Sequence, residues 1–169
     1  MKKILTILLS LLSCLNSYGQ ADSTKRIEIT GLIDSNSVLL RWVPSSYTSW
    51  ARANQFGYTV YRIPLFKKDG SIVNNPDTLK LGIVMPQPLN TWENYADSST
   101  FAIAAEALYG KEFEVTTSSG SFFDLVNKSR EQENRFTIGL ICADKSFTVA
   151  CMMGLGFTDS TANPGFAYA

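Results

Sequence analysis

Two short runs of sequence set the fold class: VLLRWVP at residues 38–44 and GYTVYR at residues 57–62. Apolar or aromatic side chains recur at every second position of each run, and residues 27–30 show the same alternation. This spacing is typical of strands with one buried face. Turn residues such as Gly31 and the Asp-Ser-Asn triplet at 34–36 punctuate the runs. The region from residue 26 to about residue 84 is therefore predicted to form antiparallel strands.

These two runs resemble strands B and C of a fibronectin type III domain. In that family a tryptophan of strand B fills the space between two sheets, and a tyrosine and a valine of strand C pack beside it. Trp42, Tyr58 and Val60 match those positions. Residues 157–168, with FTD and then PGFAY, resemble the corner between strands E and F. The resemblance implies that the hydroxyl of Tyr168 bonds to the backbone just upstream, which is a structural role.

Between the two strand regions the apolar period becomes helical. We expect one helix that Ser99 caps and Gly110 ends, a second that starts at Ser121, and a third that Asp144 caps. Residues 111–120 are rich in Thr, Ser and Gly and are predicted to form a loop. The predicted fold class is α+β: an incomplete antiparallel immunoglobulin-like β-sandwich of the fibronectin type III kind, with an α-helical insertion.

The predicted organisation is a signal peptide over residues 1–19, a linker over 20–25, a sandwich over 26–91 and 157–169, and a helical insertion over 92–156. Fibronectin-like domains have about 100 residues, which is about twenty more than the two sandwich segments supply. We therefore expect strands F and G to be incomplete and the parent protein to be longer. The resemblance is to modules of exported bacterial proteins.

The N-terminal segment reads as an export signal. Lys2 and Lys3 precede a mostly apolar stretch over residues 4–15 that is too short to span a bilayer, and small residues lead up to Gly19. The predicted location is secreted or cell surface. Leu-Leu-Ser-Cys ending at Cys14 is a loose lipobox, so lipid anchoring at Cys14 is the alternative and is the one predicted route to a membrane partner.

Composition excludes several kinds of chemistry. The 169 residues have a formal charge of +0 and contain no histidine. A Ser-His or Cys-His dyad and a His-ligated zinc site are therefore impossible. A nucleic-acid partner is not expected either, because a basic excess is absent. Cys142 and Cys151 lie in apolar runs, and the sequence leaves open whether they pair or stay as buried thiols.

No catalytic, cofactor-binding or metal-binding residue is predicted. Glu131 and Glu133 lie two apart on a predicted helix and so point in different directions. Recognition is the favoured function. Residues 45–56 are predicted to form a long loop that carries Tyr47, Trp50 and Arg52, residue types common in binding hot spots. For Trp50 we favour the structural interpretation, in which it only covers the open end of the sandwich.

The sequence thus predicts a non-catalytic structural or interaction module that displays loops and helices to an unidentified protein or glycan. Two alternatives stay open: an accessory domain of a larger secreted enzyme, and a lipid-anchored binding protein processed at Cys14.

The site of processing can be tested directly. We expect a protein exported from a bacterial host to begin at Gln20, because the junction after Gly19 is the better-formed cleavage site. Intact-mass measurement with N-terminal sequencing distinguishes this from an acylated Cys14, which would contradict cleavage after Gly19.

Overall fold

The structure is a computed structural model that describes residues 26–34, 37–110 and 122–169. The predicted signal peptide, linker and loop over 111–120 lie outside the described residues. The elements are β1 (Ile27–Asp34), β2 (Ser37–Pro44), α2 (Tyr47–Phe56), β3 (Tyr58–Arg62), β4 (Pro64–Lys67), β5 (Leu79–Val84), α3 (Leu89–Trp92), η2 (Glu93–Tyr95), α4 (Ser99–Tyr109), α5 (Phe122–Lys145), α6 (Phe147–Met152), β6 (Gly156–Asp159) and β7 (Phe166–Tyr168).

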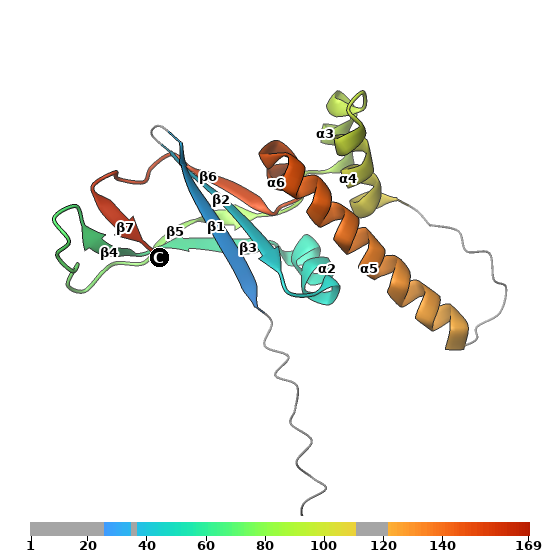
Figure 1. Cartoon of the computed structure of the whole chain (residues 1–169), viewed down its shortest axis with the longest axis horizontal. Helices are drawn as coiled ribbons and strands as arrows, with labels where there is room; N and C mark the ends of the chain where they lie inside the picture. Colours follow the sequence, from blue (N-terminus) through green and yellow to red (C-terminus); the bar gives the residue numbers. More distant parts are fainter. Residues whose placement is uncertain (1–25, 35–36, 111–121) are drawn as a thin grey trace, which may run out of the picture.

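The fold class is α+β, with small antiparallel sheets and helices at one end of them (Figure 1). One sheet has three strands in the order β1-β2-β6, and two further pairs are β3-β5 and β4-β7. The strands predicted from alternation over residues 27–30, 38–43 and 58–63 are confirmed as β1, β2 and β3. β1 and β2 pair without a break from Ile27 opposite Pro44 to Asp34 opposite Ser37.

The strand that follows the helices returns to the first sheet. Val38 of β2 lies opposite Asp159 of β6, and Arg41 lies opposite Gly156. The predicted tyrosine hydrogen bond is also present: the backbone N–H of Asn163 donates to the hydroxyl of Tyr168 at 2.8 Å, and that hydroxyl donates to the Asn163 carbonyl at 3.2 Å. Segments from both ends of the described chain therefore share one sheet.

The predicted loop over residues 45–56 is wrong, because residues 47–56 form helix α2. The Ser46 side chain accepts a hydrogen bond from the backbone N–H of Ser49 at 3.3 Å, which satisfies one free donor at the first turn. Gly57 ends the helix with a φ of 77°, a conformation that glycine adopts without a Cβ penalty. Ser46 and Gly57 are therefore the two boundaries of this helix.

The other helices start and stop near their predicted positions. They extend from Leu89 to Met152, so the first begins three residues before the predicted insertion. Ser98, and not Ser99, is the N-cap of α4. Asp144 is not a cap, since it lies inside α5, and the side chain of Ser146 caps α6 by accepting from the N–H of Val149. Ser121 lies outside the described residues, directly before α5.

One hydrophobic core joins the helices to the first sheet. Its fully buried members come from strand β2, helix α2 and the segment between β5 and β6: Trp42, Trp50, Trp92, Ala104, Cys142, Ala143, Val149, Ala150, Met152, Met153 and Leu155. Most of them belong to the predicted insertion. The helices consequently bury their apolar faces against the sheet and α2, and they do not form a separate body.

Trp42 connects this core to the second sheet. Its ring meets that of Tyr58 edge-on, with centroids 5.4 Å apart, and Leu40 and Val60 pack against the same cluster. The resemblance assigned a core role to Trp42, Tyr58 and Val60, and the burial of Trp42 confirms it for that residue.

Replacement of Trp42 by alanine should lower the free energy of unfolding by about 3–5 kcal/mol, because it leaves a cavity between the sheets. Urea unfolding measures the change. Tyr61→Ala on the outer face of β3, where the side chain is exposed, is the matched control and should cost less than about 1 kcal/mol. Equal losses in the two variants would contradict the core role of Trp42.

Candidate functional site

The three predicted partner-binding residues lie on α2, and the structure separates their roles. Trp50 is only 3% exposed and packs against Phe136 of α5, with ring centroids 5.8 Å apart. It therefore belongs to the core, which agrees with the structural role favoured from the sequence. Tyr47 is half-buried and Arg52 is exposed. Of the three, only Arg52 is fully available to a partner.

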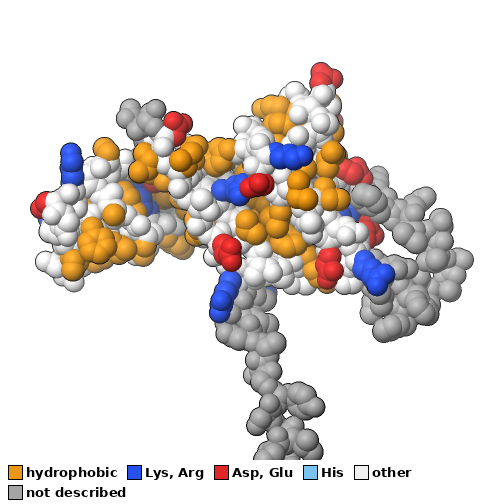
Figure 2. Space-filling model, in the orientation of Figure 1, with side chains coloured by type: hydrophobic (Ala, Val, Ile, Leu, Met, Phe, Trp, Pro, Cys, Tyr) orange, Lys and Arg blue, Asp and Glu red, His pale blue; other side chains and the backbone are white. Residues whose placement is uncertain are grey.

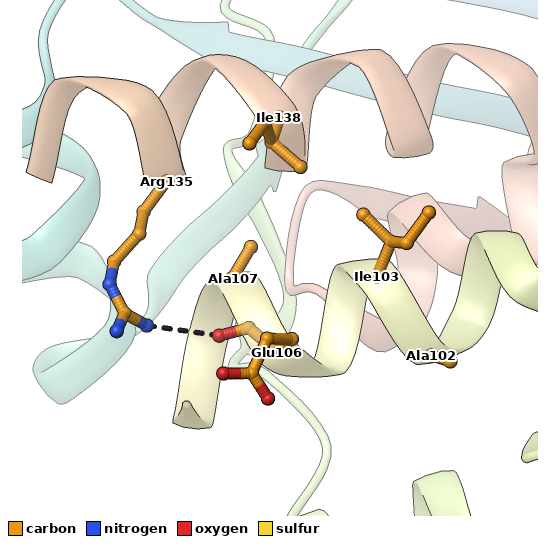
Figure 3. A pocket seen from close by; sticks show the side chains of 6 residues that line it. All are labelled: Ala102, Ile103, Glu106, Ala107, Arg135 and Ile138. Carbon is orange, nitrogen blue, oxygen red and sulfur yellow. Dashed lines mark hydrogen bonds between the residues drawn. The ribbon is translucent and has the colours of Figure 1, made fainter. Parts of the chain in front are cut away.

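An apolar groove lies between α4 and α5 and has a volume of about 300 Å³. Figure 3 shows Ile103 and Ala107 of α4 facing Ile138 of α5 across it. The remaining lining residues are Ala102, Glu106 and Arg135. Small side chains on α4 leave this space open. The sequence analysis missed the groove, although the alanine-rich sequence of α4 is a signal that a neighbouring helix or ligand approaches closely.

Arg135 closes one end of the groove. Its side chain is buried, its Nε donates to Glu131 Oε1 at 2.9 Å, and its Nη1 donates to the Glu106 carbonyl at 2.9 Å (Figure 3). The second bond ties α5 to the last turn of α4, where the negative end of the helix dipole favours a cation. The guanidinium is thus used to hold two helices together. The groove offers shape and apolar surface to a ligand.

A second hollow, of about 340 Å³, lies between β2 and the end of α5. Arg41 crosses it: Nη2 forms an ion pair with Asp144 Oδ1 at 2.6 Å, and Nη1 donates to the Ala143 carbonyl at 3.3 Å. Asp144 is largely exposed, so solvent screens this pair. Its main consequence is geometric, because it fixes the end of α5 on the sheet.

A polar cluster links β3, β6 and β7. Arg62 donates to Asp159 at 2.7 Å and to the Thr161 hydroxyl at 3.1 Å, and its guanidinium lies 5.0 Å from the ring centroid of Tyr168. Asp159 also accepts from the Thr161 hydroxyl at 2.8 Å and from the Thr161 N–H at 2.9 Å. Each oxygen of this buried carboxylate therefore has a donor, as a buried charge requires.

Burial and hydrogen bonds shift the pKa of several titratable groups in the described chain. Burial raises the pKa of Asp159, but hydrogen bonds from Thr161 and Arg62 outweigh it and hold the pKa below its ordinary value. Cys142 and Cys151 are free thiols, and burial raises the pKa of both. A thiol with a raised pKa stays protonated at neutral pH and is a poor nucleophile.

The described residues contain neither a metal-binding cluster nor a membrane-spanning helix. In this part of the chain, no group of three His, Cys, Asp or Glu side chains is placed to hold a metal ion. None of the described helices combines the length and apolar character that a membrane crossing requires.

Asp159→Asn should lower the free energy of unfolding at pH 7 by about 3 kcal/mol, because it removes the negative charge that pairs with the largely buried Arg62 guanidinium. The folded-state pKa of Asp159 is depressed, so its stabilisation is present above the unfolded pKa of about 4 and is lost as the pH falls through the folded value. The difference between wild type and variant should therefore shrink at pH 3.

Urea unfolding at the two pH values measures both effects. Asp144→Asn, which breaks the exposed ion pair with Arg41, is the matched control and should cost less than about 1 kcal/mol. A loss in Asp159→Asn no larger than in this control would contradict the structural role of the cluster.

No protein-family model, curated protein or solved structure matches this chain. The site is therefore interpreted from its own geometry.

Proposed function

We propose that the chain is a non-catalytic interaction module of an exported, secreted or surface protein, built on a fibronectin type III-like sandwich that presents the helices to a protein partner. The single observation that carries the proposal is the pairing of β2 with β6, because it places strands from both sides of the helical segment in one sheet. A sheet that is fixed at both ends of the helical segment can hold α4 and α5 in a constant position for a partner.

Strand order supports the sandwich. In immunoglobulin-like sandwiches strands A, B and E share one sheet, and strands C, F and G share the other. β1, β2 and β6 have the order of A, B and E. β3 and β4 follow each other almost without a break and would correspond to strand C, and β7 would correspond to strand F. β4 pairs with β7, and two backbone hydrogen bonds of 2.8 and 2.9 Å join Ile63, between β3 and β4, to Ala169, just beyond β7. The Tyr168 bond to Asn163 fits the tyrosine corner of the same family.

The α4–α5 groove favours a protein over a glycan as the partner. Four of its six lining residues are alanine or isoleucine, and its buried arginine already donates to Glu106 and Glu131. A sugar needs many hydrogen-bonding groups, whereas an apolar side chain of a protein gains from the removal of such surface from water. Ile103 is about half exposed, so it is the residue most available for this contact.

A photo-crosslinking amino acid at position 103, compared with one at position 72, tests the proposal. Ile72 is also exposed but lies beside β4, away from the helices. We expect a distinct adduct with one host surface protein at position 103 only. Ile103→Glu should then weaken binding of that purified protein by about tenfold or more, and Ile72→Glu should not. Identical adducts at both positions, or equal binding of both variants, would contradict the proposal.

A further inference from the structure

β1 is an edge strand that is exposed along its whole length. It lies at one side of the order β1-β2-β6, and all eight of its residues are exposed. Four of them are large and apolar: Ile27, Ile29, Leu32 and Ile33, with exposed fractions that reach 81% at Ile33. Figure 2 shows apolar side chains between charged ones on the face that β1 crosses in Figure 1.

Three common protections of a free edge are absent from β1. Natural edge strands are blocked by lysine, proline or a β-bulge. Residues 27–34 contain no lysine and no proline, and their register with β2 has no shift. An edge of this kind is a template for another strand.

The hydrogen-bond pattern shows which backbone groups face outward. The N–H of Ser45 donates to the carbonyl of Arg26 at 2.9 Å, so residue 26 bonds toward β2. Hydrogen-bonded and non-bonded positions alternate along an antiparallel pair. The N–H of Trp42, opposite Ile29, donates away from β1 to Leu155 at 3.0 Å, which agrees with this alternation. The odd-numbered residues from Ile27 to Ile33 therefore direct their N–H and C=O groups to the free edge.

The sequence of β1 is complementary to itself in one antiparallel register. When two copies are centred on Thr30, Ile27 lies opposite Ile33 and Ile29 lies opposite Gly31, with all four on one face. The glycine leaves room for the isoleucine side chain across from it. Arg26 and Asp34 face each other at both ends, so the register joins opposite charges. It also pairs outward-facing odd residues with outward-facing odd residues, as the hydrogen bonds require.

We infer that β1 pairs with β1 of a second copy of this chain about a two-fold axis at Thr30, and so joins two three-stranded sheets into one continuous sheet. Such an interface is isologous, because each copy offers the same patch to the other. Pairing uses the β1 edge of both copies, so assembly through this interface stops at the dimer.

The first test is the mass of the purified chain by sedimentation over roughly a hundredfold range of concentration. We expect a monomer–dimer equilibrium. Gly31→Pro removes an outward N–H in each copy and leaves the bonds to β2 intact, since proline is accepted in edge strands where its nitrogen faces solvent. It should raise the dimer dissociation constant by about tenfold or more. Leu32→Lys is the control, because it faces Glu28 of the second copy and should preserve the dimer.

The second test does not depend on the folding of the proline variant. Thr30 meets Thr30 of the other copy in a non-bonded pair, where Cα atoms are about 4.5 Å apart, which suits a disulfide. Thr30→Cys should give a cross-linked dimer under mild oxidation, in excess of wild type, and Glu28→Cys should give far less. A monomer at all concentrations, growth beyond the dimer, or equal cross-linking at both positions would overturn the inference.

Discussion

The structure depends on β2, because two strands, the second sheet and the end of α5 all make contact with it. β2 is the middle strand of its sheet and bonds to β1 on one side and to β6 on the other. Successive side chains of a strand point to opposite faces. Trp42 therefore meets Tyr58 of the second sheet, while Arg41 reaches Asp144 at the end of α5. A single strand thus positions a sheet, a helix and a returning strand.

The shared core explains why the helices are part of the fold and not an appendage. Met153 and Leu155 are fully buried close to where β6 begins, and Leu155 accepts the backbone hydrogen bond of Trp42. Gly154 has a φ of 71°, and a Cβ at this position would lie 2.8 Å from the backbone nitrogen of Pro86. The chain leaves α6 through a turn that few residues other than glycine can occupy, and this turn places the apolar residues next to β2.

Local pattern predicted most of the strands and helices, and tertiary placement decided the rest. The alternation around Trp42 and Tyr58 identified β2 and β3, since period-two burial is visible in one sequence. Helix α2 was missed because Ser46 and Gly57 also fit a loop, and Trp50 is its one buried residue. An arginine such as Arg135 is by residue type expected to face solvent. It is buried because Glu131 and the Glu106 carbonyl satisfy it, and the second partner comes from another helix.

The same limits apply to the candidate site. Tyr47, Trp50 and Arg52 were chosen by residue type, and residue type does not tell which of them the core will take. The α4–α5 groove depends on how two helices approach each other, and only an alanine-rich stretch hinted at it. The pairing of β2 with β6 was accessible through a family resemblance alone, because nothing local connects Val38 with Asp159.

That pairing has a consequence for folding kinetics. The contacting residues lie more than a hundred positions apart in the chain, and closing such a long loop carries a large entropic cost before any contact repays it. β1 and β2 can form a hairpin early, but the sheet is complete only after β6 has been synthesised.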